Sequence, residues 1–276
     1  MTKLAGVIGW PVSHSLSPAM MNAAFKHCGL DWNYLRMPVS TEHSSHLENT
    51  IANLHYHHFR GANVTVPYKE AVMPLLDRLS ERANNIGAVN TILVKGDKTL
   101  FGDNTDAPGF ISDLRIHNIV PEQTQATVLG AGGSARAIVY GLLEAGCTSL
   151  NIINRSKERA QQIIDDMKIL FADAVITNNK PSRAGLIVNC TSLGLNESDA
   201  LPWDPSISFN QQQIVYDLIY NPPKTALFKK AEADGARAIS GLGMLVHQGA
   251  LAFEMWTGEK APIEIMKSAA EEALNV

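Results

Sequence analysis

A glycine-rich segment, residues 130–135, carries the clearest chemical signal in the sequence. It reads Gly-Ala-Gly-Gly-Ser-Ala and lies between a short apolar run and a segment with helical periodicity. In a strand–loop–helix unit, Gly130 permits a tight turn, Gly132 lets a pyrophosphate approach the backbone, and Ala135 lets the helix pack closely on the strand. The helix N-terminus presents amide groups and a positive dipole end to the phosphates. We therefore expect a dinucleotide site, rather than a merely flexible turn, formed by Gly130, Ala131, Gly132, Gly133, Ser134 and Ala135.

The segment after the next predicted strand indicates which dinucleotide is bound. NAD sites usually place Asp or Glu about 20 residues past the glycine loop, where the carboxylate bonds the ribose 2′-hydroxyl. Here residues 154–159 read Asn-Arg-Ser-Lys-Glu-Arg. Arg155 can form a bidentate contact with a 2′-phosphate or stack over adenine, and Ser156 and Arg159 can add hydrogen bonds. A solvated basic helix start is the alternative. The segment favours NADP over NAD.

Four polar clusters in the first 106 residues form a second candidate site, each at a predicted strand end or in a loop. They are 13–18, 63–69, 90–91 and 103–106. Helix capping or turn chemistry explains any one of them taken singly. Together they offer hydroxyls, amides, one Lys and two Asp, a set that suits a small polyhydroxylated acid.

The elements that position these clusters are expected to be short strands and helices. Strand patterns lie at 4–9, 32–37, 59–65, 89–94 and 99–101, and a weak helical pattern lies at 44–53. Ser17 as N-cap and Pro18 at the first helical position predict a helix that Gly29 ends. Pro67 predicts the start of another helix, and Gly96-Asp97 predicts a hairpin turn.

From about residue 106, strands and helices alternate. Strands are expected at 126–129, 150–153, 186–190, 214–218 and 236–239, and helices around 138–143 and at 156–167, 225–233, 244–256 and 262–274. This alternation predicts a parallel, doubly wound sheet. The expected fold class is α/β with two domains and a cofactor cleft between them. Residues 1–105, completed by the C-terminal helices 241–276, form the substrate domain, and residues 106–240 form the Rossmann-type NADP domain.

Length and composition limit the class of protein. The chain has 276 residues, 45% of them hydrophobic and 18% charged, which suggests two domains and excludes a disordered or fibrous chain. A net charge of -4 gives no nucleic-acid footprint, and no apolar run approaches the roughly 18 residues of a membrane span. Cys28, Cys147 and Cys190 are far apart and form no C-x-x-C pair, which indicates a reducing, cytoplasmic compartment.

Two features resemble a metal site or a nucleophile but are better explained otherwise. His55, His57 and His58 lie at a spacing that points strand side chains to opposite faces, so no metal is expected. Cys190 lies at a strand end with no adjacent base, so we interpret it as a small packing residue.

Eight ordered blocks of the sequence lie at 9–18, 59–69, 87–91, 104–106, 130–135, 154–156, 189–191 and 243–250. Together they resemble, over nearly the whole chain, the NADP-dependent shikimate dehydrogenases of the shikimate/quinate dehydrogenase family, which act in aromatic amino-acid biosynthesis. Ala107 and Pro108 occupy positions where this family often has glycine. We expect them to stiffen the connection between the domains without changing the chemistry.

The resemblance implies reversible, NADP-dependent reduction of 3-dehydroshikimate to shikimate, with Lys69 and Asp106 at the reacting hydroxyl. Hydride leaves the carbon only as the hydroxyl proton leaves the oxygen, so a proton acceptor must lie within hydrogen-bond reach. A helix starting at Pro67 would disfavour the Lys69 ammonium through its dipole, as would a closed cleft. Which of Lys69 and Asp106 transfers the proton stays open at this stage.

The resemblance also implies the binding residues. Ser15 and Ser17 match positions that bind the substrate carboxylate, and Thr65, Asn90 and Gln248 match positions that bond the ring hydroxyls. Tyr220 matches a residue that reaches the substrate from the cofactor domain. The implied cofactor positions beyond the glycine loop are Asn154, Arg155, Ser156, Arg159, Thr191, Leu218, Gly241 and Met244. For Gly241 and Met244, a helix N-terminal turn and an ordinary core methionine are the alternative.

Two other functions remain open. A paralogue that oxidises quinate or a related cyclic acid with NAD or NADP would carry similar motifs. A non-catalytic NADP-sensing protein is a second alternative, against which the presence of both Lys69 and Asp106 argues. The expected partner is a small molecule, with no nucleic acid and no membrane, and a homodimer is left open.

Overall fold

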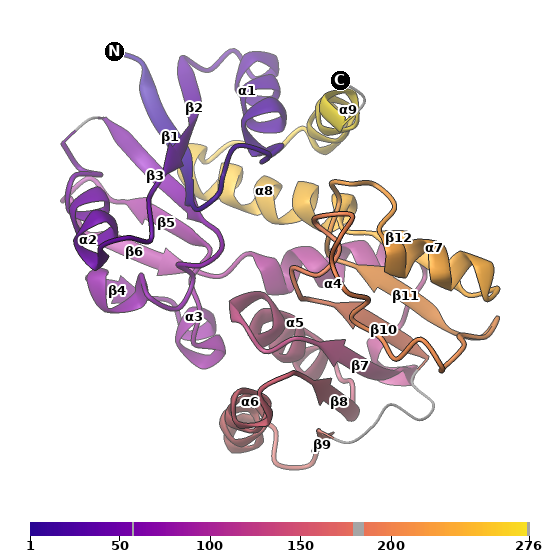
Figure 1. The fold of residues 1–276 in the computed structure, drawn as a ribbon. Helices are drawn as coiled ribbons and strands as arrows, with labels where there is room; N and C mark the ends of the chain where they lie inside the picture. The colour runs from indigo at the N-terminus through magenta and orange to yellow at the C-terminus, as the bar shows by residue number, and fades with distance from the viewer. Residues whose placement is uncertain (57, 179–184, 275–276) are drawn as a thin grey trace. The chain divides into compact units, whose positions relative to one another are not determined.

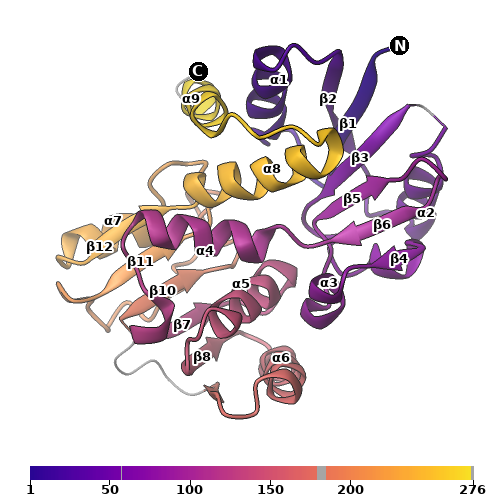
Figure 2. The same cartoon turned by 180° about the vertical axis from the view of Figure 1, so that it is seen from behind.

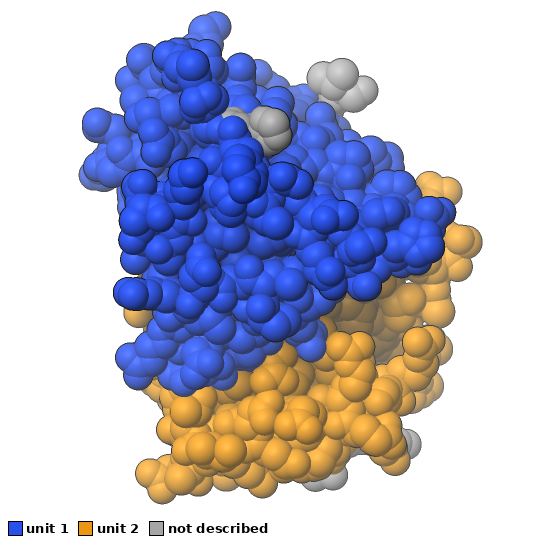
Figure 3. Space-filling model, turned by 90° about the vertical axis from the view of Figure 1, so that its left-hand side faces the viewer, with its two compact units in different colours: residues 1–109, 245–276 blue, residues 110–244 orange. Residues whose placement is uncertain are grey.

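The computed structural model describes residues 1–56, 58–178 and 185–274. The chain divides into two compact units, and each unit is built on its own sheet. Unit 1 comprises residues 1–109 and 245–276, and unit 2 comprises residues 110–244, as the two colours of Figure 3 mark. The α/β class and the Rossmann-type second half are as predicted. The unit boundaries fall inside helices α4 (Asp106–Ile116) and α8 (Leu242–Thr257).

Unit 1 is built on a six-stranded mixed sheet with the order β2-β1-β3-β5-β6-β4. Its strands are β1 (Lys3–Gly9), β2 (Trp32–Pro38), β3 (Phe59–Val64), β4 (Arg78–Leu79), β5 (Thr91–Val94) and β6 (Leu100–Asp103). The helices wholly inside it are α1 (Ser17–His27), α2 (Ser44–Ala52), α3 (Glu81–Ile86) and α9 (Ile263–Leu274). β1 runs parallel to β2 and β3, whereas β5 is antiparallel to β3 and β6. The β5–β6 pair is the predicted hairpin.

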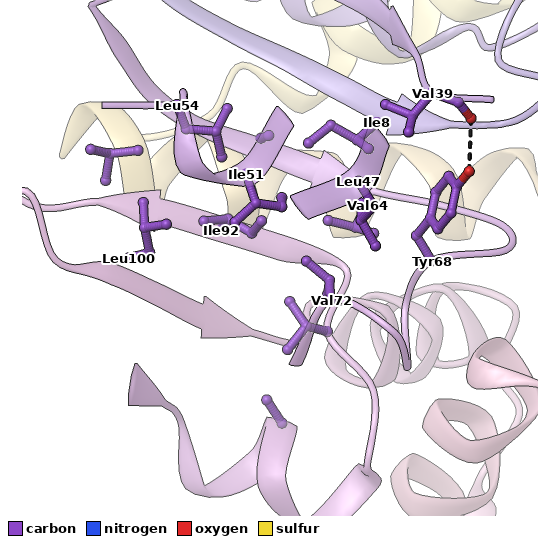
Figure 4. Close-up of a cluster of buried hydrophobic side chains, with 14 residues drawn as sticks. Ile8, Val39, Leu47, Ile51, Leu54, Val64, Tyr68, Val72, Ile92 and Leu100 are labelled. Atoms are coloured by element: carbon purple, nitrogen blue, oxygen red, sulfur yellow. Dashed lines mark hydrogen bonds between the residues drawn. The ribbon is translucent and has the colours of Figure 1, made fainter. Parts of the chain in front are cut away.

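Alternating side chains give the unit 1 sheet two apolar faces. One face packs Ile8, Val64 and Ile92 against Leu47 and Ile51 of α2, as Figure 4 shows. On the other face, Phe25 of α1 stacks on Trp32 of β2 and on Phe253 of α8, with ring centroids 5.1 and 5.4 Å apart. α1 and α9 lie side by side (Figures 1 and 2). Both faces are therefore covered, as a parallel arrangement of β1, β2 and β3 requires.

Gly61 of β3 lets α8 approach the sheet, because a Cβ at this position would lie 2.1 Å from Trp256 Nε1 and 2.2 Å from the Ile92 carbonyl oxygen. Trp256 Nε1 donates to that same carbonyl at 2.9 Å. We expect Gly61→Ala to lower the free energy of unfolding by about 3 kcal/mol, because overpacking would also break this hydrogen bond. Chemical unfolding measures the loss. The matched control is Gly96→Ala, where an added Cβ meets no atom within 4 Å. A loss no larger than that of the control would contradict the prediction.

Unit 2 is a six-stranded parallel sheet with the order β12-β11-β10-β7-β8-β9. Its strands are β7 (Gln125–Leu129), β8 (Ser149–Ile153), β9 (Val175–Thr177), β10 (Leu186–Asn189), β11 (Ile214–Asp217) and β12 (Arg237–Ser240), and its own helices are α5 (Gly133–Glu144), α6 (Lys157–Leu170) and α7 (Ala226–Ala233). From β7 the chain adds β8 and β9 toward one edge of the sheet, and from β10 it adds β11 and β12 toward the other edge. Right-handed crossovers then place α7 on the face opposite α5 and α6. Ligands of such sheets bind at the switch point, here between β7 and β10.

Two local predictions in unit 1 are wrong. No helix starts at Pro67: the chain forms turns there, followed by a short 3₁₀ segment, Met73–Leu75. The Lys69 carbonyl accepts from the Val89 N–H at 2.8 Å, outside any helical pattern, and Pro74 lacks the N–H that a helix would need. Ser17 is the first residue of α1 rather than its N-cap, which is Leu16.

Candidate active site

Lys69 and Asp106 meet in unit 1 although 37 positions separate them. Lys69 Nζ donates to Asp106 Oδ2 at 2.6 Å. The two side chains are only 12% and 6% exposed, so the pair is largely shielded from water. A buried pair of a proton donor and a carboxylate can hold and move a proton at a substrate oxygen. Its catalytic role stays a prediction.

The turn after β3 holds Lys69 by its backbone. The Tyr68 N–H donates to the Thr65 carbonyl at 2.9 Å, and the Tyr68 hydroxyl donates to the Val39 carbonyl at 2.8 Å, as Figure 4 shows. Because no helix starts at Pro67, the helix dipole that the sequence predicted for this turn is absent. The Asp106 carboxylate contacts the Lys69 ammonium directly.

Asp106 is the first residue of α4, a helix that the sequence patterns did not reveal. The Asn104 Oδ1 atom accepts from the N–H groups of Asp106 and Ala107 at 3.1 and 3.3 Å and so caps the first turn. Pro108 lies in that same turn, where a missing N–H costs no helical hydrogen bond. An Asn two residues before an acidic residue and four residues before a proline was the signal available for this helix start.

Asn90 is the centre of the polar cluster. Its Nδ2 donates to Asp106 Oδ1 at 2.8 Å, to Thr105 Oγ1 at 3.0 Å and to Gln248 Oε1 at 3.3 Å. Its Oδ1 accepts from the Thr105 N–H at 2.7 Å and from the Thr91 hydroxyl at 3.0 Å. Both ends of this 2% exposed amide are therefore fixed, and it holds the Asp106 oxygen that Lys69 does not contact.

Gln248 reaches Asn90 because two helices approach closely in unit 1. A Cβ on Gly109 of α4 would lie 2.7 Å from the Gln248 backbone nitrogen on α8. The Gln248 Nε2 atom donates to the Leu245 carbonyl at 2.8 Å, which directs its Oε1 toward Asn90. The structure thus brings four of the predicted residues into one cluster: Lys69, Asp106, Asn90 and Gln248.

Asn63 and Tyr34 join this cluster without having been assigned a role from the sequence. Asn63 Nδ2 donates to Thr91 Oγ1 at 3.0 Å, and its Oδ1 accepts from the Tyr34 hydroxyl at 2.7 Å. Asn63 belongs to the 63–69 cluster, so its place beside the site was readable. The Tyr34 hydroxyl contact depends on tertiary structure and left no local signal.

The other predicted substrate residues lie in loops or at the start of a helix. Ser15 Oγ accepts from the Ser17 N–H at 3.3 Å in the loop before α1, and Ser17 is buried. Thr65 follows β3 directly, and its N–H donates to the Ile8 carbonyl at 2.9 Å. Their predicted contacts with a substrate remain predictions. Tyr220 belongs to unit 2, in the loop after β11.

The glycine loop of unit 2 has the geometry that a dinucleotide needs. Gly130 has φ +111°, which favours glycine, and a Cβ there would lie 3.2 Å from the Cys190 backbone. Gly132 is the N-cap of α5, and a Cβ there would meet no atom within 4 Å, so the backbone is open to a ligand. Ala135 is fully buried, as close packing on the sheet requires. The loop, with the first turn of α5, therefore fits a pyrophosphate.

The segment after β8 has a donor set that fits a 2′-phosphate. Arg155 and Arg159 are exposed, and Ser156 caps α6 by accepting from the Arg159 N–H at 3.3 Å. Asn154 Nδ2 donates to the Ser156 carbonyl at 2.9 Å, which shapes this turn. A cavity of about 270 Å³ lies beside Asn154 and is lined by Lys157 of α6 and by Trp203 from the loop after β10.

A buried network shapes the loops at the carboxyl ends of β10 and β11. Asn189 Nδ2 donates to Asp217 Oδ1 at 2.9 Å, and Asn189 Oδ1 accepts from the Thr191 hydroxyl at 2.7 Å. The Thr225 hydroxyl donates to Asp217 Oδ2 at 2.6 Å. Burial raises the pKa of Asp217, while these hydrogen bonds oppose the rise. The network thereby fixes the predicted cofactor residue Thr191.

The remaining predicted cofactor residues follow β11 and β12. A Cβ on Gly241 would lie 2.1 Å from the Leu218 carbonyl oxygen, so only glycine permits this approach of the two loops. Met244 is buried in the first turns of α8. These positions, like the other predicted cofactor contacts, remain predictions.

In the described parts of the chain, no group of three or more His, Cys, Asp or Glu could hold a metal ion. His57 lies outside the described residues, and Cys190 is half-buried. Within the described ranges, no helix is both long and apolar enough to cross a bilayer.

Comparisons with protein families give the same description along the chain. A family model described as the shikimate dehydrogenase substrate binding domain matches residues 7–92. The shikimate / quinate 5-dehydrogenase model matches residues 115–189, and a shikimate 5′-dehydrogenase C-terminal domain model matches residues 241–271.

Individual relatives cover nearly the full length. The shikimate dehydrogenase (NADP(+)) of Methanopyrus kandleri is 42% identical over 285 residues, covering 99% of this chain and 96% of the relative. The crystal structure of shikimate 5-dehydrogenase from Thermus thermophilus, in complex with NADP(H) and shikimate, is 38% identical with a TM-score of 0.85 and covers 99% of this chain and 100% of its own. Quinate dehydrogenase from Corynebacterium glutamicum, in complex with NAD, is 30% identical with a TM-score of 0.86, covering 98% and 99%.

Proposed function

Because the chain belongs to the shikimate dehydrogenase family, we propose that it catalyses the reversible, NADP-dependent reduction of 3-dehydroshikimate to shikimate in aromatic amino-acid biosynthesis. The chain is an oxidoreductase, and NADP is its cofactor. The observation that carries the proposal for this chain is the 2.6 Å contact of Lys69 Nζ with Asp106, held in place by Asn90.

The residues of unit 1 supply the proton chemistry. When bound, NADPH supplies the hydride that reduces the substrate carbonyl. Both Asp106 oxygens accept from donors, Oδ2 from Lys69 and Oδ1 from Asn90, which is the pattern of an ionised carboxylate. We therefore assign proton donation to the Lys69 ammonium in the reductive direction, and proton acceptance to its amine in the oxidative direction. Asp106 orients Lys69 and the substrate hydroxyl.

The other substrate contacts follow from donor and acceptor chemistry. Asn90 and Gln248 can each donate and accept, which suits ring hydroxyls, and Thr65 adds a hydroxyl. Ser15 lies just before α1 and Ser17 is its first residue, so their hydroxyls can donate to a carboxylate near the positive end of the helix dipole. Tyr220 supplies a phenol from the cofactor unit.

Turnover with the four pairs of substrate and cofactor tests the proposal. Purified protein is assayed for nicotinamide reduction with shikimate or quinate, each with NADP or NAD. The proposal expects the highest kcat/KM with shikimate and NADP. Preference for quinate would favour the paralogue that the quinate dehydrogenase similarity suggests. NADP binding without turnover of either substrate would indicate a sensing protein.

Arg155→Asp tests the cofactor contact in unit 2. Arg155 is exposed on the turn before α6, where a guanidinium can bind a 2′-phosphate in a bidentate manner. We expect the ratio of kcat/KM for NADP to that for NAD to fall by about 10- to 100-fold, because a charge-assisted hydrogen bond is lost. Arg115→Asp, an equal charge change at an exposed position of α4, is the control. An unaltered ratio in Arg155→Asp would refute the assignment.

Compartment and assembly are further parts of the proposal. We place the activity in the cytoplasm, which the free state of Cys28, Cys147 and Cys190 supports. A homodimer stays a proposal that light scattering of the purified protein would check.

A further inference from the structure

Glu158 accepts a hydrogen bond from Ser156, whose hydroxyl is proposed to bind the cofactor. The Ser156 hydroxyl donates to Glu158 Oε2 at 2.8 Å, while Ser156 Oγ accepts from the Arg159 N–H. A serine hydroxyl has a single proton to donate. In this arrangement Ser156 cannot donate to a phosphate until it leaves the Glu158 carboxylate.

The Glu158 carboxylate also brings a negative charge into the segment expected to bind the 2′-phosphate. The side chain is exposed, and its own backbone N–H and the Ser156 hydroxyl lower its pKa, so it is ionised at neutral pH. It lies between Arg155 and Arg159 in sequence, within the first turn of α6. A 2′-phosphate carries a like charge, whereas the 2′-hydroxyl of NAD is neutral and is bonded by a carboxylate in many Rossmann folds.

We infer that Glu158 is a specificity-determining residue that weakens the preference for NADP over NAD, by withholding the Ser156 hydroxyl and by opposing the charge of the 2′-phosphate. The inference deepens the proposed function and rests on it for the identity of the ligand. A different reading is purely structural, since an acidic residue in the first turn stabilises a helix through its dipole. The experiment must therefore measure recognition of the 2′-phosphate separately from stability.

Binding of 2′,5′-ADP and 5′-AMP isolates the 2′-phosphate. Their dissociation constants are measured by calorimetry for the wild-type chain, Glu158→Gln and Glu158→Ala. Glutamine removes the charge but can still accept the Ser156 proton, whereas alanine removes both. We expect affinity for 2′,5′-ADP to rise in the order wild type, Glu158→Gln, Glu158→Ala, reaching about 5- to 20-fold in the last. Affinity for 5′-AMP should stay within about 2-fold, because that ligand lacks the opposed group.

Asp165→Asn is the matched control. Asp165 is exposed on the same helix and accepts from Gln161 at 2.8 Å, and asparagine removes its negative charge but can still accept this hydrogen bond, as glutamine can at position 158. Its 2′,5′-ADP affinity should match that of the wild type. An equal gain in the control, an equal gain for 5′-AMP, or no gain in either Glu158 variant would overturn the inference. A purely structural role would change only the thermal midpoint.

The ratio of kcat/KM for NADP to that for NAD, with shikimate, provides the second readout. It should rise in the Glu158 variants in parallel with 2′,5′-ADP affinity. If the wild type turns over shikimate with NADP but the variants keep its ratio, the inference fails and the proposed function stands. If the wild type turns over no shikimate, the proposed function fails, while the nucleotide titrations still decide the role of Glu158.

Discussion

Lys69→Ala is expected to lower kcat for shikimate oxidation by about 100- to 10 000-fold, because it removes the group that exchanges the proton with the reacting oxygen. The NADP dissociation constant should change little, since the predicted cofactor contacts all come from residues 130–244. Steady-state kinetics and a fluorescence titration with NADPH measure the two effects on the same preparations. A large fall in kcat with little change in the NADP dissociation constant indicates an interaction made at the transition state.

The control for this prediction is Lys26→Ala, which removes an exposed lysine from the last turn of α1. It should keep the wild-type kcat. Thermal unfolding of Lys69→Ala checks that the fold survives, because the change leaves the Asp106 carboxylate with one fewer partner in a shielded place. Unchanged turnover in a folded Lys69→Ala variant would remove Lys69 from the mechanism.

Asp106→Asn is expected to lower kcat by about 100-fold and the free energy of unfolding by about 1–3 kcal/mol. The carboxylate accepts Lys69 on one oxygen and Asn90 on the other. Asparagine keeps the shape but has one acceptor, so its amide nitrogen must face one of these two donors. Kinetics and chemical unfolding of the same variant measure both consequences.

The double variant Lys69→Ala/Asp106→Asn distinguishes one functional pair from two independent groups. If the two residues act as a unit, the loss of kcat in the double variant should resemble that of Lys69→Ala alone. Multiplied losses would show that Asp106 acts on the substrate independently of Lys69. A wild-type kcat in Asp106→Asn would contradict its assignment altogether.

The sequence predicted most of unit 2, because its helices are periodic and alternate regularly with short apolar strands. Gly146 has φ +90° and follows α5, as its position suggested. The strands β4 and β9 were missed because two and three residues carry no measurable period. α4 was missed because Pro108 and Gly109 favoured a loop, although the Asn104 cap outweighs them.

In the candidate site, family resemblance pointed to residues whose arrangement no local pattern encodes. Lys69 was placed on a helix that does not exist, and its contact with Asp106 depends on β3 and α4 being brought together by the sheet. The central role of Asn90 has the same origin, since its partners lie up to 158 positions away. Glu158 was visible in the sequence, but its effect on Ser156 is a matter of side-chain geometry.

The unit boundaries inside α4 and α8 limit how such enzymes can be recombined. Exchanging residues 110–244 alone for those of a relative would join two half-helices of different parentage at each seam. A chimera that keeps both helices whole either imports Asp106 and Gln248 with the nucleotide-binding half or leaves Met244 with the substrate-binding half. Coenzyme preference and alcohol recognition therefore cannot be exchanged independently in this architecture. Any crossover that keeps both helices whole leaves residues of one site with the other half of the chain.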